Sequence, residues 1–146
     1  MATLHLDIVT VERRLYSGEV DMVVAPGSDG EMGILPHHAA LLTTLKEGVL
    51  RVKRSGAEEL FSIGGGFMEV QPDHVIVLAD VAERADEIDL ARAEEARQRA
   101  EQLLKDRPTG AGVETALSAL RRAQIRIGVA QRRPQRRQMS EVKSNE

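Results

Sequence analysis

The spacing of the hydrophobic residues changes once along this chain, close to Asp86. Before that point apolar and polar residues alternate, as they do from Leu4 to Ile8, and this alternation is typical of strands with one buried face. After it, apolar residues recur every three or four positions, which is typical of amphipathic helices. Because strands and helices place successive side chains differently, the change predicts a β part followed by a helical part.

The β part reads as several short strands separated by turns. A second alternating run contains Val20, Met22 and Val24, and a third covers residues 49–53. Turn-forming residues stand between the runs, at PGSDG (26–30), Ser55-Gly56 and Pro72-Asp73. Short strands at regular intervals favour an antiparallel sandwich or barrel, which we place at residues 1–86.

The helical part, residues 87–133, is predicted to be a hairpin of two helices. The first apolar stripe consists of Leu90, Ala93, Ala96 or Arg97, Ala100 and Leu103 or Leu104, and the second of Ala116, Leu120, Ala123, Ile127 and Ala130. We expect Asp86 or Asp89 to cap the first helix and Pro108 with Gly110 to end it. Residues 134–146 have no such periodicity, so we expect a disordered tail there.

The first helix has little apolar surface to bury. Its sequence, EIDLARAEEARQRAE at 87–101, supplies a stripe made mostly of alanine. Each buried methyl group contributes about 0.8 kcal/mol, and isolated helices of this length are marginal in water. We therefore expect the hairpin to dock only weakly against the β part.

Few residues in the chain are suited to catalysis. There is no cysteine and no Gly-x-Ser-x-Gly motif, and the glycines at 64–66 are not followed by the Lys-Ser/Thr pair of a phosphate loop. His37 and His38 are adjacent, so in an extended segment they point to opposite faces and are poorly placed to share one metal ion. We therefore predict no catalytic activity, no metal site and no required cofactor.

Charge is distributed unevenly along the chain. Residues 1–87 carry seven basic and fifteen acidic side chains, a net of −8, and residues 88–146 carry thirteen and eight, a net of +5, which together give −3. Such asymmetry favours an interaction surface. The chain has neither a charged start followed by a long apolar run nor eighteen consecutive apolar residues, so we expect a soluble chain.

Nucleic-acid binding is the first alternative that this charge raises. Arg132, Arg133, Arg136 and Arg137 are suited to neutralising phosphates. The three aromatic residues all lie in the acidic half, so no stacking platform accompanies the basic tail, and we predict no nucleic-acid partner. A stand-alone small-molecule-binding domain is a further alternative.

Three segments carry a family resemblance. GEMGILPHHAALLTTLKEGVLRV, GGGFMEVQPDHVIVLAD and EIDLARAEEARQRAE, in this order and spacing, resemble the epsilon subunits of F-type ATP synthases over about residues 3–130. The resemblance implies a ten-stranded antiparallel β-sandwich of two five-stranded sheets, followed by an antiparallel two-helix hairpin.

The resemblance also implies a function. Such a chain is a non-catalytic subunit of the rotating central stalk, peripheral to the cytoplasmic face of the cell membrane, which it meets only through the complex. Its sandwich binds the gamma subunit and the ring of c subunits. It couples proton-driven ring rotation to ATP synthesis, and its mobile hairpin extends toward the catalytic alpha and beta subunits to inhibit ATP hydrolysis.

Particular residues match positions of that family. The resemblance implies contacts of Glu31 and His38 with the c ring and gamma, and it places His37 where glycine is common, a residue that adopts positive φ easily. A solvated turn carboxylate is the alternative for Glu31. The arginines implied to contact the acidic catalytic head are Arg121, Arg122, Arg126, Arg132 and Arg133; a solvated basic face is the alternative for them.

A nucleotide site is the most specific expectation. Residues 88–93, IDLARA, match the Ile/Leu-Asp-x-x-Arg-Ala pattern of family members that bind ATP as a regulatory ligand in the folded hairpin. The resemblance implies a site made of Glu83, Ile88, Asp89, Arg92, Ala93, Arg99, Arg122 and Arg126, with the four arginines around the triphosphate. The alternative is pairing along the first helix, Asp89 with Arg92 and Glu95 with Arg99.

Overall fold

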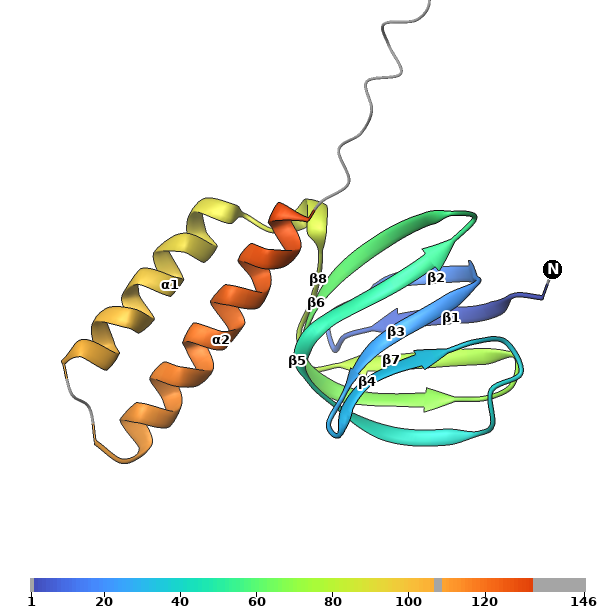
Figure 1. Cartoon of the computed structure of the whole chain (residues 1–146), viewed down its shortest axis with the longest axis horizontal. Helices are drawn as coiled ribbons and strands as arrows, with labels where there is room; N and C mark the ends of the chain where they lie inside the picture. Colours follow the sequence, from blue (N-terminus) through green and yellow to red (C-terminus); the bar gives the residue numbers. More distant parts are fainter. Residues whose placement is uncertain (1, 107–108, 133–146) are drawn as a thin grey trace, which may run out of the picture.

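The computed structural model describes residues 2–106 and 109–132, and it shows a β-sandwich with two antiparallel helices packed at its side (Figure 1). The strands are β1 Leu4–Val9, β2 Arg14–Val20, β3 Met22–Gly27, β4 Gly30–Ile34, β5 Leu41–Arg54, β6 Ala57–Val70, β7 His74–Ala79 and β8 Ala82–Arg84. The change from strands to helices falls where the hydrophobic spacing predicts it.

Two long strands account for a difference from the expected strand count. The described residues form eight strands in one hydrogen-bonded order, β2-β1-β7-β6-β5-β3-β4, with β8 beside β6. The first half of β6 pairs with β8 and its second half with β7, and β6 pairs with β5 throughout. Because β5 and β6 curve from one layer into the other (Figure 1), each counts twice in a description of two five-stranded layers.

The sheet differs from the expectation in one further respect. Strands β1 and β7 run parallel, with Leu6 opposite Val75 and Ile8 opposite Val77, whereas the other paired strands are antiparallel. A parallel pair needs a long crossover, and here the chain from β2 to β6 supplies it.

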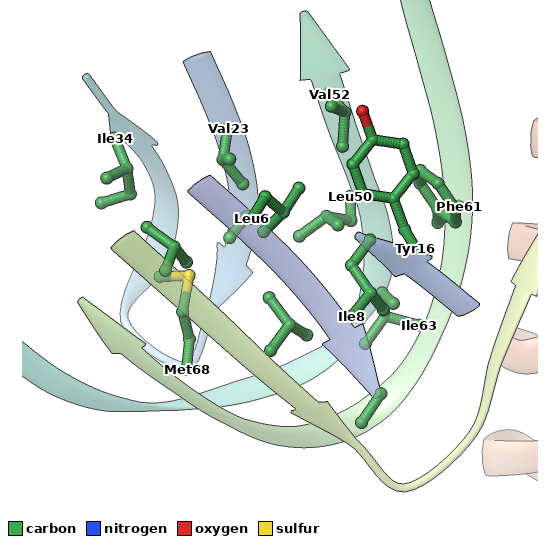
Figure 2. Packing of buried hydrophobic residues seen from close by; sticks show 14 of the residues in the cluster. Leu6, Ile8, Tyr16, Val23, Ile34, Leu50, Val52, Phe61, Ile63 and Met68 are labelled. Carbon is green, nitrogen blue, oxygen red and sulfur yellow. The ribbon is translucent and has the colours of Figure 1, made fainter. Parts of the chain in front are cut away.

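The core lies between two layers. The first layer contains β2, β1, β7, the second half of β6 and the first half of β5, and the second layer contains β4, β3, β8, the second half of β5 and the first half of β6. Figure 2 shows side chains from several strands converging there, among them Leu6, Ile8 and Phe61, each with no exposed surface. The predicted burial of alternate residues in β1 is confirmed. The second alternating run is not one strand, because β2 ends at Val20 and β3 begins at Met22; consequently Val23 lies in the core (Figure 2).

The turns lie where the sequence predicts them. Ser55 and Gly56 join β5 to β6, with φ of 49° and 77°, and Gly30, with φ of 137°, follows the turn between β3 and β4. Gly66 allows a close approach between strands, because a Cβ there would stand 2.1 Å from the Leu78 carbonyl oxygen.

The helices are η1 Ala85–Glu87, α1 Leu90–Lys105 and α2 Ala111–Gln131. Of the two predicted caps, Asp89 is the one observed, since its side chain accepts a hydrogen bond from the Arg92 amide. Alanines line the buried sides of both helices, at 93, 100, 116 and 123. In the predicted first stripe Ala93 and Ala100 are buried and Leu104, one of the two alternatives at its end, is half-buried, whereas Leu90 is exposed. Pro108 lies outside the described residues, as do Arg133 and the predicted tail, 134–146.

Within 2–106 and 109–132, no helix combines the length and apolarity needed to cross a bilayer.

Candidate functional site

Helix α2 docks on the outer face of the second layer through a small apolar cluster. Leu60 of β6, Ala85 and Ile88 of the linker, and Val129 and Ala130 of α2 are buried together there. Val129 is wholly buried, although it lies off the stripe predicted from the sequence. The signal for it was the pair Ile125 and Val129, four residues apart on a second side of α2.

Arginines of α2 lie beside this cluster, facing acidic residues of the sandwich. Arg126 makes a two-point hydrogen bond to Glu83 of β8, at 2.7 Å from Nε to Oε1 and 3.1 Å from Nη2 to Oε2. Arg122 donates to the Ser118 hydroxyl at 2.8 Å. Together these three charged side chains line a pocket of about 40 Å³, with Ser62, Ile63, Gly64, Val81 and Ile125 as the other lining residues.

The other residues predicted for the nucleotide site lie elsewhere. Ile88 belongs to the docking cluster and Ala93 is buried in the hairpin. Arg92 is exposed, with Nε 3.6 Å from Asp89 Oδ2, which is the pairing expected along the helix. Arg99 lines a separate hollow on α1 with Glu95, Gln98 and Gln102. The structure thus brings Glu83, Arg122 and Arg126 together at one pocket and places Arg99 in another hollow.

Glu47 of β5 is a site residue that sequence reasoning missed. Its carboxylate accepts a hydrogen bond from the Ser118 hydroxyl at 3.2 Å and lies 3.6 Å from Arg122 and 3.9 Å from Arg121. A single glutamate in a strand gives no local pattern that distinguishes it from a solvated carboxylate. Arg132, the residue that ends α2, is exposed and lines another hollow.

The segment around Glu31 forms a second charged region. Glu31 Oε1 lies 2.9 Å from Arg51 Nη2, and both residues line a hollow of about 380 Å³ with Lys46 and Arg132. Its other lining residues are Pro26, Gly48 and Val49.

The two histidines nearby are held by backbone hydrogen bonds. His38 donates from Nδ1 to the carbonyl of Ala39 at 2.7 Å. The amide of His37 donates to the Pro72 carbonyl at 2.8 Å. His37 has a φ of 68°, so this position has the backbone conformation for which glycine is favoured.

Ion pairs fix the linker before the hairpin to the sandwich. Arg13 makes a two-point contact with Glu87, at 2.9 and 2.7 Å, and this hydrogen bond lowers the pKa of the Glu87 carboxyl and raises the pKa of Arg13. Arg84 lies over the rings of Tyr16 and Phe61, about 6 Å from each centroid. The segment that precedes α1 is therefore anchored, and Ile88 with Asp89 connects it to the helix.

An exposed apolar surface lies on the outer side of the first layer. Leu42 of β5, Phe67 of β6 and Leu78 of β7 are 71, 51 and 53% exposed. Phe67 stands directly opposite Leu78 in the pairing of β6 with β7, and Leu42 lies on the neighbouring strand. We call these three residues the apolar face. Contiguous exposed apolar side chains of this kind mark surfaces that bind other proteins.

Comparison with known proteins connects these features to one family. A family model for the beta-sandwich domain of the ATP synthase delta/epsilon chain matches residues 3–85, and a model for its long alpha-helix domain matches residues 86–131. The chain is 56% identical to the ATP synthase epsilon chain of Dehalococcoides mccartyi, over 91% of this chain and 96% of the relative. It is 52% identical to that of Desulforamulus reducens, over 88% and 98%.

Solved structures support the fold. The chain resembles a chain in the Euglena gracilis mitochondrial ATP synthase assembly of OSCP, F1 and c-ring, with a TM-score of 0.75 and 24% identity over 85% of this chain and 79% of that one. A chain in the central stalk and c-ring assembly of Tetrahymena thermophila gives a TM-score of 0.59 at 16% identity, over 87% and 96%.

Proposed function

The chain belongs to the delta/epsilon chain family of ATP synthases, and from this we propose that it is a non-catalytic rotor subunit of a proton-translocating F-type ATP synthase. It couples rotation of the c ring to ATP synthesis and restrains ATP hydrolysis through its C-terminal hairpin. The observation that carries the proposal is the match of both family models, in order, along residues 3–131. Its place is the cytoplasmic face of the cell membrane, as a peripheral part of the complex.

The sandwich supplies the attachment to the rotor. The apolar face has the chemistry of a protein contact, and we assign the gamma subunit to it because the relatives that this chain resembles are stalk subunits. Glu31 and His38 are assigned to the contact between the sandwich, gamma and the polar loops of the c ring. Arg51 holds the Glu31 carboxylate at 2.9 Å, which limits the positions that the carboxylate adopts when it meets the ring.

The hairpin supplies the restraint on hydrolysis. Its docking cluster contains few large apolar residues, so separation from the sandwich costs little compared with unfolding. Once separated, α2 presents Arg121, Arg122 and Arg126 to the acidic surface of the catalytic alpha and beta subunits. Arg132 and Arg133 extend the same basic sequence.

ATP is the proposed regulatory ligand of the docked hairpin. The pocket between Glu83, Arg122 and Arg126 offers two guanidinium groups to phosphates. Arg92 and Arg99 of α1 are exposed, and their side chains change position to reach a bound triphosphate, with Arg92 leaving Asp89. At one hundred times its dissociation constant, a ligand that binds only this form stabilises it by about 2.7 kcal/mol. Abundant ATP then holds the hairpin down, and scarcity releases it.

Reconstitution tests the proposed function. The full chain is added to a gamma-containing F1 complex that lacks its own epsilon subunit, and ATP hydrolysis is measured at low and high ATP. We expect a stable complex and inhibition that weakens as ATP rises. A chain that binds no gamma-containing complex would overturn the rotor assignment, and binding without inhibition would overturn the restraint.

Calorimetric titration of the isolated chain tests the nucleotide site. We expect saturable ATP binding, measured with and without magnesium, that Arg126→Ala weakens by at least about tenfold because it removes a charged phosphate contact. Arg14→Ala, which removes an exposed arginine of β2, is the matched control and should leave binding unchanged. Absence of heat at millimolar ATP would exclude the site and leave the rotor assignment standing.

A further inference from the structure

The position of Glu47 gives its carboxylate access to α2. Glu47 lies where β5 passes from one layer to the other, and its partner in the pairing with β6 is Gly64. Because glycine has no side chain, nothing on the neighbouring strand at that position competes for the space beside Glu47. A Cβ on Gly64 would stand 3.2 Å from the side chain of Val81, so a larger residue there would crowd the same surface.

Three groups on one side of α2 converge on this carboxylate. Ser118 donates its hydroxyl to Oε1 at 3.2 Å, Arg122 Nη1 lies 3.6 Å from Oε1, and Arg121 Nε lies 3.9 Å from Oε2. Arg121 and Arg122 follow Ser118 by three and four positions, so each lies beside Ser118 on the helix surface. Arg122 also donates to the Ser118 hydroxyl, so one of the two guanidinium groups is held beside the hydroxyl that binds Glu47.

The burial of Glu47 makes this contact more than a surface pairing. Its side chain is 24% exposed, and its Oε2 is buried and accepts no hydrogen bond from any described residue. A desolvated carboxylate oxygen without a hydrogen bond is unfavourable unless cations lie close by, and here Arg121 and Arg122 are those cations. When α2 leaves the sandwich, this compensation is lost and water replaces it.

We propose that Glu47 is an electrostatic latch, a carboxylate of the sandwich that holds the docked hairpin by occupying Arg121 and Arg122. The latch is distinct from the contact between Glu83 and Arg126, because it uses another strand and two other arginines. It rests on the docking of the hairpin in the proposed function and deepens it. Because it acts in the isolated chain without nucleotide or partner, its failure is distinguishable from a failure of that function. While Glu47 contacts Arg121 and Arg122, it competes with any acidic surface of another protein that binds these two arginines.

A distance measurement on the full chain tests the latch. The chain has no cysteine, so Asp29→Cys and Gln102→Cys introduce two unique sites for spin labels, one on the sandwich and one on α1. The distribution of distances between the labels gives the ratio of undocked to docked molecules. This ratio is compared among the otherwise unchanged chain, Glu47→Gln, Arg122→Gln and the double variant.

The latch predicts a specific pattern. Glu47→Gln raises the ratio about two- to fivefold, as expected for loss of one partly screened ion pair; Arg122→Gln raises it similarly; and the double variant adds little to either. Raising the salt concentration increases the ratio in the unchanged chain more than in Glu47→Gln. Glu69→Gln is the matched control: it makes the same substitution on an exposed residue near the end of β6, and it leaves the ratio unchanged.

Two outcomes would overturn the latch. One is a ratio and a salt response of Glu47→Gln that equal those of Glu69→Gln. The other is full additivity of Glu47→Gln and Arg122→Gln, which would show that the two residues act separately. If circular dichroism shows that Glu47→Gln unfolds the sandwich, a cycle of Ser118→Ala with Arg121→Gln replaces it, because these two residues meet at the Glu47 carboxylate, and additivity or its absence decides in the same way.

Discussion

At the scale of single residues, His37 adopts a backbone conformation that favours glycine. Its φ of 68° costs a residue with a Cβ about 1–2 kcal/mol. Glycine avoids this cost but loses more conformational entropy on folding, so the net gain is smaller. We predict that His37→Gly raises the free energy of unfolding by about 0.5–1 kcal/mol. Chemical denaturation measures the change.

His37→Ala is the control for that prediction. Alanine removes the imidazole but keeps the Cβ, so it should not bring the gain. If His37→Ala stabilises the chain as much as His37→Gly, the side chain and not the backbone conformation is responsible, and the strain assigned to this position is wrong.

Glu87 gives the stability of the chain a dependence on pH. Its pKa lies below the ordinary 4.5 because Arg13 donates a hydrogen bond to the carboxylate. A lowered folded-state pKa adds stability above pH 4.5, and this contribution is lost as pH falls through the folded-state pKa. We therefore predict that Glu87→Gln is less stable than the unchanged chain at neutral pH, and that the difference shrinks as pH falls below about 4.5.

Thermal unfolding between pH 7 and 3 measures this difference. Glu69→Gln is a suitable control, because Glu69 has no such arginine partner among the described residues. A difference between Glu87→Gln and the unchanged chain that stays constant down to pH 3 would contradict the prediction.

The sequence pointed to some of the residues at the contact between α2 and the sandwich and did not point to others. Glu83, Arg122 and Arg126 were found through a family pattern, and the structure gathers them at one pocket. Glu47 and Glu87 were not found, because their partners lie 71 and 74 positions away in the sequence. Contacts over such separations are set by topology, which periodicity does not encode.

At the scale of elements, α2 depends on Val129 for its docking. Val129 is the wholly buried residue that α2 contributes to the docking cluster. Val129→Ala removes two methyl groups and costs about 1–2 kcal/mol, which corresponds to a rise of about five- to thirtyfold in the undocked population. We predict this rise with little change in the sandwich, because the main core lies in a separate cluster.

Hydrogen exchange followed by mass spectrometry measures the rise. Peptides from α2 should exchange faster in Val129→Ala, while those from β1 and β7 keep their protection. Leu117→Ala, also in α2 but exposed, is the control. Equal acceleration in both parts would mean that hairpin and sandwich unfold together, contrary to the weak docking proposed here.

Elements differed in how well the sequence predicted them. The turns and both helices were predicted because glycine, proline and capping residues act locally. The lengths of β5 and β6 were not predicted, since a strand that curves between layers keeps its hydrogen bonds while its buried side changes, and the alternating pattern is interrupted. Leu90 was predicted to be buried in α1 but is exposed. The spacing of apolar residues does not show where along a helix its partner covers it.

At the scale of the whole molecule, the apolar face is the surface assigned to gamma. A charge placed at its centre must be desolvated on binding, so we predict that Phe67→Asp weakens binding to purified gamma subunit at least about tenfold. Val11→Asp is the control, because Val11 is an exposed apolar residue in the turn between β1 and β2. Titration monitored by calorimetry measures both, and equal weakening would place the gamma contact elsewhere.

The fold of the whole molecule also explains the uneven distribution of charge along the chain. The sequence predicted an interaction surface from an acidic first part and a basic second part. The structure shows that the two parts meet within one molecule, through Glu47 and Glu83 of the sandwich and the arginines of α2. Composition gives the sign of each part, but only the fold shows that each neutralises the other.

The continuity of β5 and β6 bears on how this molecule carries force. Two layers held together by side chains alone slide past each other when they are pushed sideways, because dispersion contacts have no direction. Here each layer contains part of the same two strands, so sliding would have to stretch covalent backbone and break a ladder of paired amides. A twisting load applied at the apolar face is therefore passed to the opposite layer as tension along the chain, and the sandwich turns as a stiff body.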